Sequence, residues 1–412
     1  MAKTLCVNPA GNNGCYTTIG AAVAAASAGD QVSVGQGQYT ESVTIAKPLS
    51  LVGAGPHATI INAHGMANGI YLDGLDNGGL SNVLVTGFTV MNANFEGILV
   101  TNTSDSLIAN NHVANNDLSL NFASAACPGL PDFETSEGED CGEGVHLVGA
   151  FQVTVANNVI ELNSGGILLS DETGETYENL ITGNAVRDNA LDCGITLASH
   201  PPSPHASSKA PYGVVSNNIV SNTISGNGIV GQGAGVGIYA PGPGNLALSN
   251  KIIGNTILNN GLPGVAMHNH AAPPGTPAPN MNGNVVLGNY ISGNGADTED
   301  AATPGTAGIN VYSVAPVYAT QILENTIANE SIGVVMNHPG GMDMHLNNLL
   351  TANGVTNLGN GGVSATMNYF SCGSGPGIQS SCDTKGSGIV IAPLLPAPVT
   401  TAPAAPHQRG GM

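Results

Sequence analysis

A short glycine-led motif recurs along most of this chain and constrains its fold more than any other feature. The motif has the form Gly-Φ-x-Φ-x-x, where Φ is an apolar residue, and it occurs ten times between Gly69 and Gly362. Successive copies lie as close as Gly144 and Gly166 or as far apart as Gly97 and Gly144, which indicates a repeat of fixed size that carries loops of different lengths. Apolar alternation over such short stretches predicts β-strands and leaves no room for amphipathic helices.

Second elements lie between the motif copies, and they combine apolar alternation with asparagine where a coil would turn. Asparagine tolerates left-handed backbone conformations, and asparagines above one another can form hydrogen bonds along a stack. The asparagines expected at these corners are Asn184, Asn222, Asn255, Asn289 and Asn325. The sequence therefore predicts an all-β chain, a single right-handed parallel β-helix that forms a solenoid of about ten to twelve coils.

The two ends of the chain differ from the repeats. Residues 16–28 have the pattern of an amphipathic helix that ends at Gly29 and caps the first coil, where strand edges would otherwise be open. After Ile391 the sequence is rich in proline and alanine, which is typical of a flexible segment. The expected organisation is one β-helix domain over residues 1–391, including its N-terminal cap, followed by a flexible tail over residues 392–412.

The chain is acidic and sparsely charged, and this composition excludes several classes of partner. Only 8% of its 412 residues are charged, and the formal net charge is −20. Nucleic acid is not expected as a partner, because phosphate binding requires clustered Lys and Arg. No run of residues approaches the roughly 20 apolar residues that cross a bilayer. We expect a monomer without a membrane span.

Seven cysteines form three close pairs and leave Cys193 alone. The pairs are Cys6 and Cys15, Cys127 and Cys141, and Cys372 and Cys382. Disulfides at these pairs would suit an oxidising compartment, whereas reduced thiols in the cytosol are the alternative. We expect a secreted, cell-surface or periplasmic protein whose signal peptide is absent from this sequence. Cys193 directly precedes a motif glycine and is expected to be a buried small apolar residue rather than a nucleophile.

Two stretches resemble a known group of proteins. TIGAAVAAASAGDQVSVGQGQYTESVTI, near the N-terminus, resembles the cap and first coil of the pectate-lyase-like superfamily of right-handed parallel β-helix proteins, which includes proteins with NosD-type repeats. LSDETGETYENLITGNAVRDNALDCGITLASH resembles a stretch that recurs in bacterial β-helix proteins of unassigned activity. The resemblance covers roughly residues 17–391, and it implies this fold and a carbohydrate ligand without implying one reaction. Members include polysaccharide lyases, glycoside hydrolases, uronate epimerases and non-catalytic surface proteins.

The motif separates core side chains from outward side chains. Its second and fourth positions are apolar in all copies and should fill the core, so the third and fifth positions should point outward. Polar side chains collect at or just after these outward positions in the third to ninth copies, beneath proline-rich loops that would wall a groove. The candidate catalytic residues are His146, Asp171, Glu172, Asp192, His200 and His268. The candidate substrate-binding residues are Tyr239, His270, Tyr312 and His338.

Three kinds of chemistry are compatible with these residues. Glycoside hydrolysis needs two carboxyl groups about 5–9 Å apart, for which Asp171 and Asp192 are the first candidates and Glu172 is a third. A lyase or an epimerase needs a base such as His or Tyr and, because the groove offers almost no Lys or Arg, Ca²⁺ held by Asp171 and Glu172. A Cu or Zn site centred on His268 and His270 is the third reading.

We expect a polysaccharide or an oligosaccharide as the ligand, and a polysaccharide-cleaving enzyme of the hydrolase type or of the lyase and epimerase type. The alternative is a non-catalytic glycan-binding or surface-adhesion protein that uses the same groove. The acidic run from Asp132 to Glu143 is read as a solvated surface, with Ca²⁺ binding as its alternative. A lyase product would carry a conjugated double bond that absorbs near-ultraviolet light, whereas a hydrolase product would carry only a new reducing end.

Overall fold

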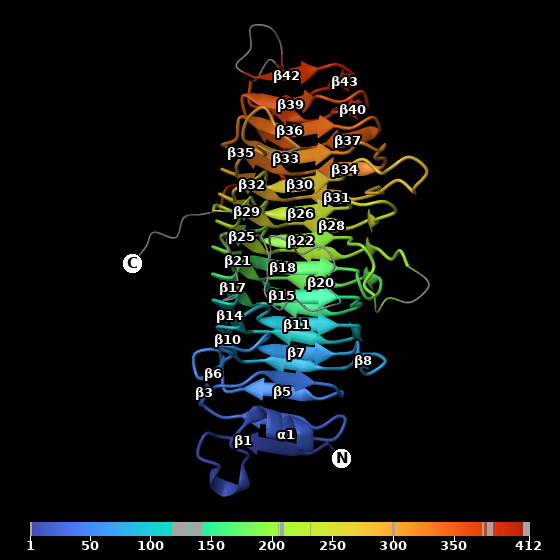
Figure 1. The fold of residues 1–412 in the computed structure, drawn as a ribbon. Helices are drawn as coiled ribbons and strands as arrows, with labels where there is room; N and C mark the ends of the chain where they lie inside the picture. The colour runs from blue at the N-terminus through green and yellow to red at the C-terminus, as the bar shows by residue number, and fades with distance from the viewer. Residues whose placement is uncertain are drawn as a thin grey trace.

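The computed structural model is an elongated solenoid of parallel strands that begins near the helix at the N-terminal end (Figure 1). The structure describes residues 2–117, 133, 142–204, 206, 210–230, 232–298, 301–372, 375–376 and 382–406. Three long parallel sheets, of 14, 12 and 12 strands, extend along the solenoid, and the chain passes through them in turn. The fold is therefore a parallel β-helix, as the repeat predicts.

One 12-stranded sheet, which we call the motif sheet, contains nine of the ten motif copies. Its strands are β4 (Val43–Ile45), β7 (Ile70–Asp73), β11 (Ile98–Thr101), β15 (Glu143–Val148), β18 (Gly165–Ser170), β22 (Ile195–Ala198), β26 (Val236–Tyr239), β30 (Val265–His268), β33 (Ala307–Tyr312), β36 (Ile332–Asn337), β39 (Asn353–Asn357) and β42 (Asp383–Gly386). The tenth copy, from Gly362, lies instead in the 14-stranded sheet. The pattern does not distinguish the sheets, because apolar alternation is common to the strands of all three.

The other two long sheets complete the coils. The 14-stranded sheet contains β1 (Thr4–Val7), β2 (Gln31–Val34), β5 (Ser50–Gly53), β9 (Leu84–Thr86), β13 (Leu107–Ala109), β16 (Thr154–Ala156), β20 (Leu180–Thr182), β24 (Asn218–Val220), β28 (Lys251–Ile253), β31 (Val285–Leu287), β34 (Thr320–Leu323), β37 (Gly341–His345), β40 (Gly362–Ser364) and β43 (Ile389–Val390). The second 12-stranded sheet contains β3 (Gly37–Tyr39), β6 (Thr59–Asn62), β10 (Thr89–Met91), β14 (His112–Ala114), β17 (Val159–Glu161), β21 (Ala185–Arg187), β25 (Thr223–Ser225), β29 (Thr256–Leu258), β32 (Tyr290–Ser292), β35 (Thr326–Ala328), β38 (Asn348–Leu350) and β41 (Tyr369–Phe370). Two small parallel sheets are formed by β8 (Leu80–Ser81) with β12 (Thr103–Ser104), and by β19 (Thr176–Tyr177), β23 (Val214–Val215) and β27 (Ala247–Leu248).

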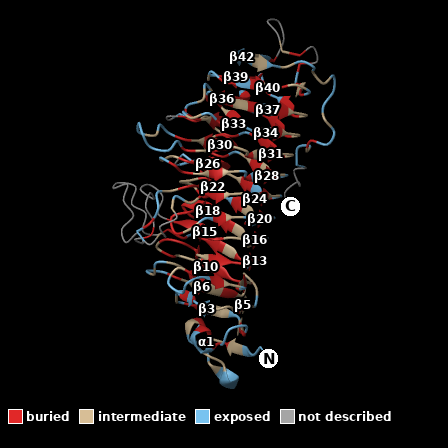
Figure 2. Cartoon of the chain, turned by 90° about the vertical axis from the view of Figure 1, so that its right-hand side faces the viewer, coloured by how far each residue is buried: buried red, intermediate tan, exposed pale blue. Residues whose placement is uncertain are grey.

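The apolar core lies inside the coils. The second and fourth motif positions are buried in every copy, as predicted, and Ile167 and Leu169 of β18 are fully buried. Figure 2 shows buried residues along the strands and exposed residues mainly in the loops that leave them. The motif glycine allows close approach of neighbouring coils, because a Cβ at Gly166 would lie 2.1 Å from the carbonyl oxygen of Gly194. The motif therefore combines core filling with close stacking.

Buried asparagines form hydrogen-bonded ladders at the turns between strands. The five predicted corner asparagines all belong to one ladder, in which each residue donates to the side chain of the next. At Asn184, the main-chain N–H and the side-chain Nδ2 both donate to Oδ1 of Asn222, at 2.9 and 3.0 Å. A second ladder ends at Glu330, whose Oε1 accepts from Nδ2 of Asn294 at 3.1 Å. The ladders satisfy polar groups that the corners bury, and they fix the stacking of the coils.

The N-terminal helix packs against the first coils. Helix α1 (Ile19–Ala25) follows the 3₁₀ turn η1 (Asn12–Gly14), is shorter than predicted, and contacts β1, β2 and β4. The carboxylate of Glu41 accepts hydrogen bonds of 2.8 Å from the first two main-chain N–H groups of α1. Those groups have no partner within a helix, so the carboxylate stabilises the helix start.

The C-terminal segment also contacts the solenoid. The side chain of Asn348 in β38 donates to the carbonyl oxygen of Val399 at 3.1 Å and accepts from its N–H at 2.7 Å. Ala402 is buried. In the segment expected to be a flexible tail, the residues that the structure describes therefore include contacts with the second 12-stranded sheet.

Two predicted disulfides are present, Cys6–Cys15 and Cys372–Cys382. The third predicted pair, Cys127 and Cys141, lies outside the described residues. Cys193 is a free and buried thiol, as expected, and burial raises its pKa well above the usual value. Within the part of the chain that the structure describes, no helix is both long and apolar enough to span a membrane.

Candidate functional site

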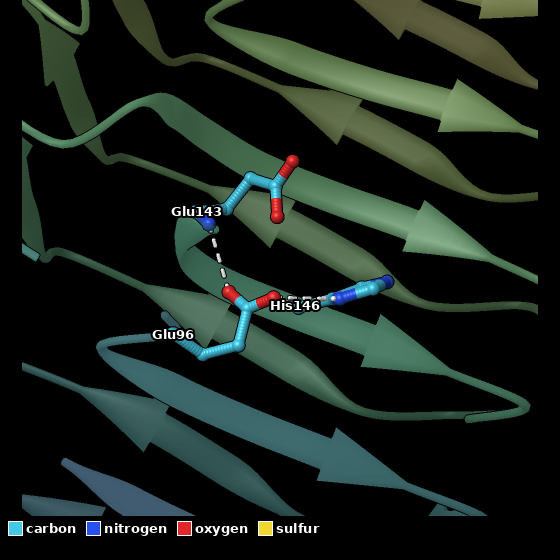
Figure 3. A group of neighbouring side chains, drawn as sticks. All are labelled: Glu96, Glu143 and His146. Carbon is cyan, nitrogen blue, oxygen red and sulfur yellow. Dashed lines mark hydrogen bonds and ion pairs between the residues drawn. The ribbon is translucent and has the colours of Figure 1, made fainter. Parts of the chain in front are cut away.

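A buried chain of carboxylates and imidazoles lies on the outer side of the motif sheet. His146 occupies an outward motif position in β15, yet its side chain is fully buried. Its Nδ1 lies 3.0 Å from Oε1 of Glu96, and its Nε2 lies 2.8 Å from Oγ of Ser170 in the next coil. The other oxygen of Glu96 accepts a hydrogen bond of 2.8 Å from the main-chain N–H of Glu143 (Figure 3). Because β11 and β15 pair in register, Glu96 and Glu143 are stacked on adjacent coils.

A second set of polar residues lies at the ends of β18 and β22. Asp171 and Glu172 follow β18, and Ser199 and His200 follow β22. Oε1 of Glu172 lies 2.6 Å from Nδ1 of His200. The two oxygens of Asp171 accept from the main-chain N–H of His200 at 2.7 Å and from the hydroxyl of Ser199 at 2.8 Å. The group that we call the carboxylate–imidazole network consists of Glu96, Glu143, His146, Glu172 and His200.

Burial favours the protonated form of both carboxyl groups that follow β18, but their pKa values shift in opposite directions. Burial raises the pKa of Asp171 to about 7, although its hydrogen bonds from His200 and Ser199 act in the opposite direction. Burial also opposes ionisation of Glu172, but the charge and hydrogen bond of His200 and the charge of His146 hold the pKa of Glu172 below its usual value. Oε2 of Glu172 is buried without a hydrogen-bond partner among the described residues. Near neutral pH, Glu172 is therefore a carboxylate, while Asp171 is partly protonated.

Loops and neighbouring side chains cover most of this network. All residues of β15, β18 and β22 are buried, on both faces. Phe133 packs in one cluster with Val148, and the N–H of Ser203 donates to the carbonyl oxygen of Glu172. His200 is the most exposed of the paired side chains, with 11% of its surface accessible. The open groove predicted along this face is therefore absent over the described residues of these three strands, because their outward side chains are buried.

Asp192 lies away from Asp171. It precedes β22, whereas Ser199, which contacts Asp171, follows that strand. Four extended residues span about 13 Å, at about 3.3 Å each, and a glycosidase pair needs about 5–9 Å. Oδ2 of Asp192 accepts a hydrogen bond from the hydroxyl of Thr196 at 3.4 Å. The structure thus does not bring Asp171 and Asp192 together as a hydrolase pair.

Aromatic and imidazole rings form a second group further along the motif sheet. Tyr239 in β26, His268 in β30 and Tyr312 in β33 are in register at the fifth motif position. The ring centroid of His268 lies 5.2 Å from that of Tyr312 and 4.5 Å from that of His270. The ring of Tyr239 lies over Gly237, where a Cβ would be 2.3 Å from the ring. The group that we call the ring cluster consists of Tyr239, His268, His270 and Tyr312.

The remaining candidate, His338, is almost fully buried outside both groups. Its Nδ1 accepts from the N–H of Gly340 at 3.1 Å, and burial lowers the pKa of His338 to about 4. His338 is 2% exposed, so a dissolved ligand does not reach it in this structure. Met267 and Met336 lie in the main core. Their thioethers are therefore not available as ligands to the Cu or Zn site that the sequence suggests around His268 and His270.

Three residues of the site are missing from the sequence-based candidates: Glu96, Ser170 and Ser199. The sequence predicts Glu143 only as the end of an acidic, solvated run, but it is 2% exposed; residues 132 and 134–141 of that run lie outside the described residues. Glu96 and Glu143 carry a signal that could have been used, since each directly precedes a motif glycine and both therefore occupy the same place in a coil. Ser170 stands at the outward fifth position of its motif copy. The useful signal is the position within the repeat, because that position decides which side chains meet across coils.

Comparisons with known proteins agree with this architecture. The sequence profile of the family described as "Periplasmic copper-binding protein (NosD)" matches residues 132–312. Comparison with curated proteins gives no match. Among solved structures, pectate lyase Pel9A is similar with a TM-score of 0.53 and 17% identity, over 81% of this chain and 77% of that chain. The chain has the pectate-lyase-like, right-handed parallel β-helix fold.

One further solved structure, a tailspike protein, supports the same fold. The Dettilon tailspike protein is similar with a TM-score of 0.55 and 16% identity, over 91% of this chain and 65% of the tailspike chain. The alginate lyase from Paenibacillus sp. str. FPU-7 has a TM-score of 0.45 and 12% identity, over 94% of this chain and 99% of that chain. At these identities, the two structures with TM-scores above 0.5 establish the fold alone, and the activity has to be argued from the residues of this chain.

Proposed function

We propose that this protein is a secreted, carbohydrate-active enzyme that acts by proton abstraction, as a lyase or an epimerase does, with His200 as the base. The observation that carries this proposal is the hydrogen bond of 2.6 Å between Oε1 of Glu172 and Nδ1 of His200. A carboxylate on one imidazole nitrogen fixes the tautomer and the orientation of the ring, and it directs Nε2 away from the carboxylate as the basic atom. Glu172 is fully buried while His200 is partly exposed. The carboxylate is therefore held inside the protein, and part of the imidazole is accessible.

The reaction would start at the carbon next to the carboxyl group of a uronate unit. Nε2 of His200 takes the proton from this carbon, and its electron pair moves into the adjacent carboxyl group as an enolate. In a lyase, this electron pair forms a carbon–carbon double bond while the neighbouring glycosidic bond breaks, and the departing sugar oxygen takes a proton from water. In an epimerase, the same carbon takes a proton from water on its opposite face, and His200 then releases its proton to the resulting hydroxide.

Ca²⁺ held by Asp171 and Glu172, as expected from the sequence, has little support in the geometry. Both oxygens of Asp171 accept hydrogen bonds from the protein, and Oε1 of Glu172 pairs with His200. Ca²⁺ prefers about six to eight oxygen ligands. We therefore propose that Glu172 orients the base, His200, and that Asp171 holds the chain segment that carries His200. Because an acidic protein repels polyuronates, assays should contain a divalent cation that screens the repulsion.

A glycan-binding protein without catalysis is the second candidate, and the ring cluster favours it. His270 is exposed and Tyr312 is half-buried, so their rings offer apolar faces and polar edges to a sugar. Both candidates would act outside the cytosol, where the Cys6–Cys15 and Cys372–Cys382 disulfides are stable.

The test is incubation of the purified chain with polygalacturonate, alginate and a neutral β-glucan. We expect near-ultraviolet absorbance from a polyuronate product, or epimer conversion by NMR, and we expect His200→Gln to lower kcat by about 10²- to 10⁴-fold. His112→Gln is the matched control, because His112 pairs with Glu161 at 2.9 Å on the second 12-stranded sheet, and its kcat should not change. If no product and no new reducing end form while binding to a glycan array persists, the enzyme proposal is wrong and the second candidate replaces it.

A further inference from the structure

We infer that Glu96, Glu143 and His146 bind one divalent transition-metal ion of the Zn²⁺ type. One ligand atom from each residue, a carboxylate oxygen or an imidazole nitrogen, lies within 4.8 Å of the other two. Figure 3 shows both carboxylates on the same side of the strands, with the imidazole beside the carboxylate of Glu96. The glutamates are each 2% exposed and the histidine is 0% exposed. The three ligands are therefore enclosed by protein and come from two adjacent coils.

The charges of these residues favour a bound cation. Glutamate binds a metal ion as a carboxylate and histidine binds it as a neutral imidazole, so this ligand set would carry two negative charges that a divalent ion cancels. Among the described residues, Oε1 of Glu96 lies 3.0 Å from Nδ1 of His146, which is charged only when the imidazole is protonated. Glu172 places a further buried carboxylate near His146, and Oε2 of Glu172 has no hydrogen-bond partner among the described residues. Buried carboxylates in this number are costly unless a positive charge compensates them.

The donor atoms indicate which cation would bind. Zn²⁺ takes imidazole nitrogen and carboxylate oxygen at about 2.0–2.2 Å in a tetrahedron, so its ligand atoms lie about 3.3 Å apart. Nδ1 of His146 and Oε1 of Glu96 are already 3.0 Å apart, and a small outward movement would admit the ion. Nε2 of His146 contacts the hydroxyl of Ser170 at 2.8 Å, which is the type of outer contact that orients a ligating imidazole. Ca²⁺, which prefers about six to eight oxygens, suits this set poorly.

Metal binding is tested on the full chain after chelator treatment and dialysis. Calorimetric titration with Zn²⁺ and elemental analysis should both give one ion per chain, and Co²⁺ should give a visible absorption band at the same stoichiometry. Glu143→Gln and His146→Gln should each abolish both signals. Ser170→Ala removes only the outer contact and should weaken Zn²⁺ binding about 10- to 100-fold. An excess of Ca²⁺ should not displace Zn²⁺.

Two further variants are controls for the position of the ion. Glu161→Gln removes a carboxylate from another imidazole pair, and His270→Gln changes the ring cluster, so neither should alter Zn²⁺ binding. Circular dichroism shows which variants are folded, and Glu96→Asp, which keeps the charge, should weaken binding at least tenfold if a Gln variant does not fold. The inference is overturned if the folded wild-type chain takes up no stoichiometric Zn²⁺, if Glu143→Gln and His146→Gln retain it, or if His270→Gln abolishes it. These measurements do not depend on enzymatic activity, so they are independent of the proposed function.

Discussion

The carboxylate–imidazole network and the ring cluster lie on the same motif sheet, but they are built in different ways. The network extends from Glu96, just before β11, to His200, just after β22; it is largely buried and contains contacts of 2.6–3.0 Å between charged or polar atoms. The ring cluster extends from β26 to β33, is partly exposed, and is joined by ring contacts of 4.5–6.2 Å. One repeat therefore presents two kinds of surface.

Burial accounts for the difference between the two groups. A charge removed from water needs a hydrogen-bonded or oppositely charged partner, whereas a half-exposed ring does not. Where chain segments cover β15 and β18, the outward positions hold residues that can keep a proton or a metal ion in place. Where the coils are more open, the same positions offer ring surfaces to a ligand. We expect the network to control the chemical step and the ring cluster to control affinity.

The largest expected effect is on kcat and KM, which should respond differently to changes in the two groups. Glu172→Gln removes the carboxylate that orients His200 and should lower kcat about 10²- to 10³-fold while KM changes little. Tyr312→Ala removes a ring contact with His268 and should raise KM up to about tenfold while kcat is preserved. Steady-state kinetics on the polyuronate substrate checks both. If both variants changed KM alone, the division between the two groups would be wrong.

A smaller effect is expected on the pH dependence of stability. The unfolded carboxyl of Asp171 titrates near pH 4 and the folded one at about 7. Between these values the folded chain holds a proton that the unfolded chain has lost, so the free energy of unfolding should fall as pH rises from about 4 to about 7. Asp171→Asn mimics the protonated group, and it should be more stable than the wild type by about 1–3 kcal/mol at pH 8.

Urea unfolding at pH 4 and pH 8 measures this difference. At pH 4 the variant and the wild type should have similar free energies of unfolding, because Asp171 is then protonated in the folded chain. Tyr312→Phe, in the ring cluster, is the control and should change stability equally at both pH values. A variant that is less stable than the wild type at pH 8 would contradict the assignment of a raised pKa to Asp171.

The smallest effect is expected within the ring cluster. Tyr239→Phe removes the contact of 3.3 Å between the Tyr239 hydroxyl and Sγ of Cys193, and it should cost less than about 1 kcal/mol. Gly237→Ala should cost more, because its Cβ would displace the Tyr239 ring. Thermal melting of the two variants checks this order. The reverse order would mean that polar contacts, as in the network, hold this cluster too.

Several features of the fold and the site could be predicted because the repeat encodes them locally. Alternation places Ile167 and Leu169 in the core, and asparagine at each turn predicts the ladder that includes Asn184. The same alternation places His146 on the outer face of β15. Asp171 directly follows β18, the next strand of the motif sheet. The predicted residues Asp171, Glu172 and His200 do come together, whereas Asp192 and His338 lie apart from them. Local patterns predict whether a side chain points into the core or outward. They do not predict which other residues cover it.

The sequence by itself determined the strands, the core positions, the asparagine ladder and the outward direction of the candidate side chains, because each depends on a period of two residues within one coil. The tertiary structure decided that Glu96 and Glu143 stack in register across a long insertion, that Phe133 and Ser203 lie over the outer face, and that the tenth motif copy joins another sheet. These outcomes depend on how loops of unequal length close and pack between coils. No pattern within a single coil carries that information.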